Sequence, residues 1–204
     1  MRRRSPAVRP EPRPDGSTRL LALGGVVGPA AFVAAWAIGG ARAVGYSPVE
    51  DAISRLAAVG APTRPGMTAG FITFGVGVPL YGLALRRVLP GPAWAFAVAT
   101  GLATLAVAAL PLDAGVDEAH GVAAGLGYAT LAGVPLSAAP YLQGRRATAA
   151  ALAAGAATAG LLIATLGGGR HGLLQRSGLA ATDVWIAVTA AKLAVRARLE
   201  SPGG

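Results

Sequence analysis

Six apolar stretches divide this chain, and its arginines gather at alternate ends of them. The stretches cover residues 20–41, 66–85, 93–110, 121–142, 147–166 and 178–195, and the first five contain no charged residue. A helix that crosses the hydrocarbon layer of a bilayer needs roughly 20 mainly apolar residues. The pattern therefore predicts an all-α, polytopic membrane bundle of six transmembrane helices.

The composition is typical of a membrane protein. Apolar residues make up 53% of the 204 residues and charged residues 13%, which is about half the charged fraction of a soluble domain. The 30 glycines suit helices that pack closely inside a membrane. Close contacts are expected at glycines four residues apart, namely Gly24 and Gly28, Gly66 and Gly70, and Gly121 and Gly125. The lack of cysteine excludes disulfides and thiolate chemistry.

The net charge of +9 is unevenly distributed. With the N-terminus inside, thirteen basic residues lie on the cytoplasmic side and five, Arg42, Arg55, Arg64, Arg170 and Arg176, lie outside. A cytoplasmic excess of basic residues sets topology, so both termini are predicted to be inside. The same distribution argues against a nucleic-acid partner. The expected partners are the lipid bilayer and, at the basic helix ends, lipid headgroups; the oligomeric state is open.

Three regions follow from this pattern. Residues 1–19 are rich in Arg and Pro and are predicted to form a disordered, basic cytoplasmic tail. Residues 20–196 form the six-helix domain, and residues 197–204 form a short tail. A signal peptide cleaved near Ala41-Arg42-Ala43 is the alternative, but the apolar run before it exceeds the usual 7–15 residues or so. A bacterial plasma membrane is the expected location.

The unusual polar residues map to the three predicted outer loops. Acids dominate the second loop and bases the third, so the loops are expected to form one ion-paired cluster in which Arg55 and Arg176 face acids. The acids available to them are Asp51, Asp113, Asp117 and Asp183. The full cluster comprises Asp51, Ser54, Arg55, Asp113, Asp117, His120, Arg170, His171, Arg176 and Asp183.

Both histidines of the chain belong to this cluster. Asp117 and His120 are three residues apart and share a helical face, a spacing that can ligate a metal, and His171 and Asp113 would complete the site. His120, His171 and Asp117 are thus the candidate catalytic residues, and Asp113, His120 and His171 the candidate metal ligands. The simpler interpretation is that His120 pairs with Asp117 at the water interface. Ser54 lacks the surroundings of a serine nucleophile, and the sequence leaves the cofactor unknown.

The sixth stretch contains the only charges of the six, Asp183 and Lys192. Asp183 is expected at the outer interface and Lys192 at the inner one. A transporter is suggested by the repeat of Gly77-Val78-Pro79-Leu80 as Gly133-Val134-Pro135-Leu136, because weak internal repeats are common in transporters. Chance repetition in a Gly- and Ala-rich chain is the alternative. The absence of charge inside the first five stretches argues against ion coupling.

Several motifs together resemble a known family. They are the segment Tyr46 to Leu56 with Gly60-Ala61-Pro62, Pro111-Leu112-Asp113 with His120, and Gly172-Leu173-Leu174-Gln175-Arg176 before Trp185. The resemblance is to the "domain of unknown function 998" family and covers about residues 20–196. It implies a six-span integral membrane protein and brings no established activity or catalytic residues.

Three functional classes remain open. The first is a lipid-interacting or accessory membrane protein with an outward-facing polar cluster. The second is a metal- or acid/base-dependent hydrolase that acts on a lipid or envelope precursor. The third is a small transporter. Convergence of His120, His171 and Asp113 would favour the hydrolase, and a polar cavity that reaches the middle of the bundle would favour the transporter.

Overall fold

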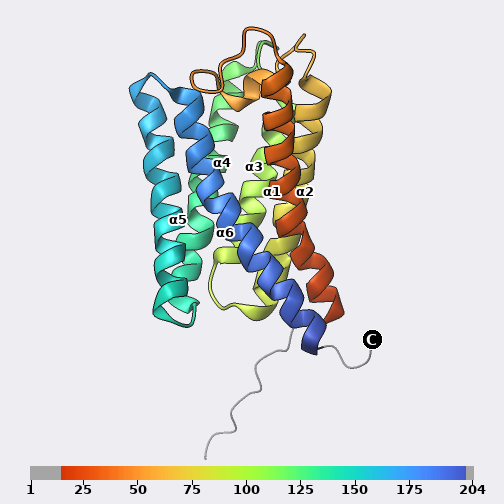
Figure 1. Ribbon diagram of the computed structural model, residues 1–204, viewed down its shortest axis with the longest axis vertical. Helices are drawn as coiled ribbons and strands as arrows, with labels where there is room; N and C mark the ends of the chain where they lie inside the picture. Colours follow the sequence, from red (N-terminus) through yellow and green to blue (C-terminus); the bar gives the residue numbers. More distant parts are fainter. Residues whose placement is uncertain (1–14, 201–204) are drawn as a thin grey trace, which may run out of the picture.

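The computed structural model describes residues 15–200, which form six α-helices that run up and down through one bundle (Figure 1). These are α1 (Gly16–Arg42), α2 (Arg64–Val88), α3 (Ala93–Ala109), α4 (Asp117–Ala138), α5 (Arg145–Ala164) and α6 (His171–Glu200). Short 3-10 helices are η1 (Ile53–Ala57), η2 (Ala139–Tyr141) and η3 (Thr165–Gly167). No strand occurs between residues 15 and 200, which confirms the all-α prediction.

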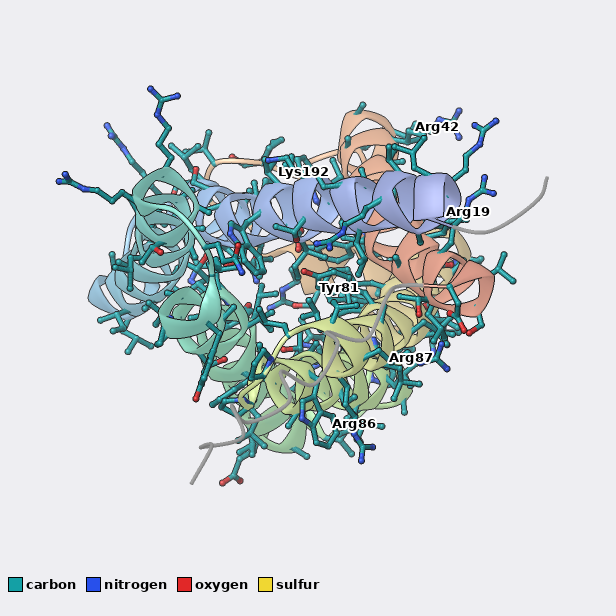
Figure 2. All side chains as sticks on the ribbon, turned by 90° about the horizontal axis from the view of Figure 1, so that it is seen from below. Arg19, Arg42, Tyr81, Arg86, Arg87 and Lys192 are labelled. Atoms are coloured by element: carbon teal, nitrogen blue, oxygen red, sulfur yellow. The ribbon has the colours of Figure 1, made fainter. Side chains whose placement is uncertain are left out.

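Five of the six helices are long and apolar enough to cross a membrane, and α3, with 17 residues, is the shorter apolar one. We call the end of the bundle that carries loops 43–63, 110–116 and 168–170 the loop end. The opposite end, where α1 starts and α6 finishes, is the terminal end (Figure 1). Figure 2 looks onto the terminal end, where Arg19, Arg86 and Arg87 extend around the edge of the bundle.

The first and last helices extend beyond the domain limits expected from the sequence. The Asp15 side chain caps α1 by accepting hydrogen bonds from the Thr18 hydroxyl and the Thr18 backbone N–H, at 2.7 and 2.8 Å. These bonds hold the pKa of the Asp15 carboxyl well below its usual range. Residues 16–19, predicted to belong to a disordered tail, are therefore helical. The rest of that predicted tail, residues 1–14, and residues 201–204 lie outside the described part of the chain.

Small residues determine how α1 approaches its neighbours in the terminal half of the bundle. A Cβ atom placed on Gly77 of α2 would lie 2.6 Å from the carbonyl oxygen of Gly24, and one on Gly25 would lie 2.8 Å from Ala190 of α6. The close contact predicted at Gly24 and Gly28 is confirmed. The prediction was wrong for Gly121 and Gly125, where a Cβ would meet no atom within 4 Å.

Helix α6 crosses the bundle obliquely (Figure 1). Towards the loop end it packs on α5, where the Thr158 hydroxyl lies 2.7 Å from both the Gly178 carbonyl and the Thr182 hydroxyl. Towards the terminal end it packs on α1 through Ala190. In the loop-end half of the bundle, α1 instead contributes Phe32, whose ring packs on Phe71 and Phe74 of α2 at 5.6 and 5.2 Å.

Candidate functional site

The three loops meet at the loop end, as predicted. A single ion pair, from Arg55 Nη1 to Asp113 Oδ2 at 3.1 Å, joins the first loop to the second, and both side chains are about half exposed. The Val59 N–H also donates to the Leu112 carbonyl at 3.0 Å. The third loop is joined to the first by the Arg170 N–H, which donates to Glu50 Oε2 at 2.9 Å. The prediction that Arg55 faces an acid is confirmed.

Arg176 faces carbonyl oxygens, and the prediction that it faces an acid was wrong. Its Nη1 donates to the carbonyls of Pro48, Asp51 and Gly172 at 2.8, 3.1 and 3.0 Å, and its Nη2 donates to the Tyr46 hydroxyl. The guanidinium also stacks near the rings of Trp36 and Tyr46, at 5.3 and 5.5 Å. Backbone carbonyls therefore take the place of a carboxylate around this buried cation.

The neighbouring residue, Gln175, holds the same loop from below. Its Oε1 accepts from the Ile53 N–H at 2.8 Å, and its Nε2 donates to the Tyr128 hydroxyl. Gly172 has no room for a side chain, because a Cβ there would lie 2.7 Å from the Pro48 carbonyl oxygen. The first turns of α6 thus clamp residues 46–53. Sequence reasoning missed Gln175 and Tyr128. The available signal was the pair of adjacent polar residues, Gln175 and Arg176, directly before an apolar stretch.

Tyr46 completes the clamp on the first loop. Its hydroxyl lies 3.2 Å from the Ala52 carbonyl oxygen, to which it donates. Burial raises the pKa of the Tyr46 hydroxyl, while the Arg176 guanidinium acts in the opposite direction. The hydroxyl therefore stays protonated at neutral pH and serves as acceptor for Arg176 and donor to the loop.

Asp117 pairs with the second loop and not with His120. The Asp117 Oδ1 accepts from the Asp113 N–H at 2.9 Å. His120 is buried, with its Nδ1 2.6 Å from the Leu110 carbonyl oxygen; because a carbonyl only accepts, Nδ1 carries the hydrogen. Among residues 15–200 no three metal-ligating side chains form a group, so the expected combination of Asp113, His120 and His171 does not assemble.

A central cavity of about 60 Å³ lies beneath the clamped loop. Its lining residues come from η1 and from α1, α2, α3, α4 and α6, so it lies between these helices. Ser54 and His120 line it, together with Gln175 and Tyr128. The remaining lining is aromatic, aliphatic or hydroxylic and comprises Phe32, Ile53, Phe71, Phe74, Thr100, Thr104, Val107, Ala124, Gly127, Leu131 and Leu179.

A second, larger hollow is an open groove of about 740 Å³ between the end of α1 and the start of α2. Ile38, Leu56 and Met67 contribute apolar side chains to it, and Arg42 and Arg55 contribute guanidinium groups. The groove opens where the small-residue contact between the two helices ends, since Gly70 of α2 still packs on Ala35 of α1. It was not anticipated, because it depends on how two helices diverge.

Asp183 lies far from the loops, so its assignment to the polar cluster and to the outer interface was wrong. α6 begins at His171, seven residues before the predicted start of the sixth span at 178. Asp183 is therefore more than three turns from the start of the helix, and not one turn or so as predicted. Its side chain is 3% exposed, and its Oδ1 has no hydrogen-bond partner in the described part of the chain. Lys192 is exposed on α6.

Searches against curated proteins and against solved structures give no match. The family model described as "Protein of unknown function (DUF998)" matches residues 26–192. This range begins in α1, ends in α6 and includes both hollows and Asp183. The chain belongs to the DUF998 family.

Proposed function

We propose that this protein is a lipid-interacting membrane protein whose α1–α2 groove receives the headgroup of an anionic lipid. The observation that carries this proposal is the lining of the groove. Arg42 and Arg55 outnumber Asp51, the one acid of the lining, and lie beside an apolar surface made by Ile38, Leu56 and Met67. A lipid that bears a phosphate headgroup and acyl chains is complementary to both parts.

The position of the groove along the helices supports a headgroup site. It lies at the last turns of α1 and the first turn of α2, where a spanning helix leaves the hydrocarbon layer. Ile38 and Val44 beside it are 51% and 103% exposed, as apolar side chains that face lipid would be. α3, at 17 residues, is within the range of roughly 17–25 that crosses a bilayer. Six spans with both termini inside would put the groove in the outer leaflet of a bacterial plasma membrane.

Electrostatics favour an anionic lipid over a neutral one. The Arg42 guanidinium has no ion pair or hydrogen bond within residues 15–200, and Arg55 remains half exposed beside Asp113. Arginine binds phosphate through two parallel hydrogen bonds. The first turn of α2 also lines the groove through Pro65, Gly66 and Met67, and the start of a helix favours an anion.

Native mass spectrometry of the protein released from nanodiscs can test the site. Wild type is expected to retain phosphatidylglycerol in preference to phosphatidylcholine. An arginine near the membrane surface contributes about 1 kcal/mol to binding of anionic lipid, so the Arg42→Gln/Arg55→Gln double variant should lose about 30-fold in affinity. The matched control is Arg145→Gln/Arg146→Gln, an exposed arginine pair at the terminal end. No lipid preference in wild type, or an equal loss in the control, would refute the proposal.

The hydrolase alternative has less support. His120 uses Nδ1 to bind the Leu110 carbonyl, and the predicted metal ligands do not converge among the described residues. The transporter alternative gains one specific observation, the buried Asp183 in the middle of α6. Sequence reasoning argued against ion coupling because the first five stretches contain no charge, and it expected this acid at the outer interface.

A further inference from the structure

Asp183 is an acid buried within the bundle. It lies 12 residues after the start of α6 and 17 before its end, or about 18 Å from the loop end at 1.5 Å per residue. Its Oδ1 is buried without a hydrogen-bond partner in the described chain. A carboxylate taken from water without a partner is strongly disfavoured, and an ionisable residue at this depth is usually retained for a function.

The surroundings of Asp183 differ on its two sides. One turn nearer the loop end, Leu179 lines the central cavity. One turn nearer the terminal end, Ile186 is completely buried, and Ala190 then packs on Gly25. The Tyr81 hydroxyl lies 2.6 Å from the Thr189 hydroxyl in this closed half, near the middle of the bundle in Figure 2. Along α6, the part of the cavity wall nearest to Asp183 is therefore Leu179, on the side of the loops.

Few other titratable groups lie on the helices around Asp183. α4 carries His120 and Tyr128 on the cavity wall and two acids, Asp117 and Glu118, in its first turn. α2 carries Tyr81 in the closed half and arginines at its two ends. α1 and α5 have titratable side chains only near their ends. On α6 itself, Arg176 is bound by carbonyls, Lys192 is exposed, and His171, Arg196 and Arg198 lie towards the two ends of the helix. No cation among residues 15–200 forms an ion pair with Asp183, so no counter-ion stabilises its charged form.

We propose that Asp183 is a proton-binding site that is loaded from the loop end through the central cavity. A water in the liquid takes up about 30 Å³, so the cavity, at about 60 Å³, has room for about two waters. The polar groups of His120, Tyr128 and Gln175 on its wall can hydrogen-bond these waters. A proton from the solution at the loop end joins one carboxylate oxygen of Asp183 to give the neutral acid, and no other bond is made or broken. This site is independent of the lipid groove.

Infrared spectroscopy of the protein in lipid bilayers tests the protonation state directly. Wild type should show the C=O stretch of a carboxylic acid at neutral pH, and Asp183→Asn should lack it. Asp183→Glu should keep the band at a shifted frequency, which provides a second test if the Asn variant folds poorly. Asp113→Asn, which removes an exposed ion-paired acid, should keep the wild-type band. Absence of the band in wild type, or its survival in Asp183→Asn, overturns the proposal.

The route is tested by the rate at which the same band shifts in D₂O. Ala124 lines the cavity, so Ala124→Leu should fill part of it and slow the shift at least tenfold. Ala156 is exposed on α5 and does not line the cavity, and Ala156→Leu should leave the rate unchanged. An unchanged rate in Ala124→Leu, or a band position that follows sodium concentration in place of pH, rejects a proton site loaded through the cavity.

Discussion

Truncation of Arg176 should release the first loop without unfolding the bundle. Arg176→Ala removes four hydrogen bonds, three to carbonyls and one to the Tyr46 hydroxyl. A hydrogen bond to a charged group contributes about 1.5–3 kcal/mol net. The sum overestimates the loss, because the substitution also removes a buried cation and because Pro48 is exposed, so water can reach its carbonyl. We expect a net loss of about 3 kcal/mol, which equals two such hydrogen bonds at the lower value of about 1.5 kcal/mol each.

Hydrogen–deuterium exchange locates this loss. The amides of Ser47, Asp51 and Ile53 are bonded within the clamped segment or to Gln175, and 3 kcal/mol corresponds to about 100-fold faster exchange through local opening. Amides in the middle of α2 and α3 should exchange as in wild type. Arg176→Lys should give an intermediate rate, because a lysine keeps the charge but cannot bond four acceptors in a fixed fork.

Arg170→Ala is the matched control for this experiment. Arg170 is exposed, and its contact with Glu50 is made by the backbone N–H, which the substitution keeps. Its loop exchange should therefore match wild type. Unchanged exchange in Arg176→Ala, or equal acceleration in Arg170→Ala, would show that the guanidinium does not hold the loop.

Two further predictions address packing and topology. Gly77→Ala should lower the free energy of unfolding in mixed micelles by about 1–3 kcal/mol, because the new Cβ meets the Gly24 carbonyl at 2.6 Å; Gly125→Ala, which meets no atom within 4 Å, should raise it by up to about 1 kcal/mol. Equal effects would refute the packing argument. In intact cells, engineered cysteines at Ser5 and Ser201 should resist an impermeant thiol reagent and one at Ala114 should react, since the chain has no native cysteine; labelling at Ser201 but not Ser5 would imply an odd number of spans.

Hydrophobic pattern and charge complementarity were sufficient to predict the helices and one loop contact. The six apolar stretches correspond to the six helices. A run of about 20 residues without charge is typical of a membrane-spanning helix and of few other structures. The Arg55–Asp113 ion pair follows from opposite charges on two loops at the same end of the bundle. These features depend on residue type along the chain, which a sequence states directly.

The surroundings of Arg176 and Asp183 could not be predicted in the same way. The acceptors of Arg176 are mostly main-chain carbonyls, which every residue has, so no sequence signal distinguishes Pro48 or Asp51 as a partner. The start of α6 was placed at residue 178 because Gln175 and Arg176 are polar, although both side chains face inward and are buried. Because of that error, Asp183 was predicted at the membrane interface. Its burial, which is the main observation in favour of proton coupling, was therefore not expected.

The tilt of α6 explains why the bundle is closed at one end and hollow at the other. In the terminal half, Gly25 and Ala190 let α1 and α6 touch, and Gly24 and Gly77 do the same for α1 and α2. In the loop-end half, α6 lies on α5, and the space left beside α1 is bordered by the large rings of Phe32 and Phe74. Small residues let helix backbones approach closely, whereas large rings keep the helices farther apart. The cavity is thus a consequence of where the small residues stop, and Asp183 lies on α6 between the hollow half and the closed half, where a bound proton would have access from one side only.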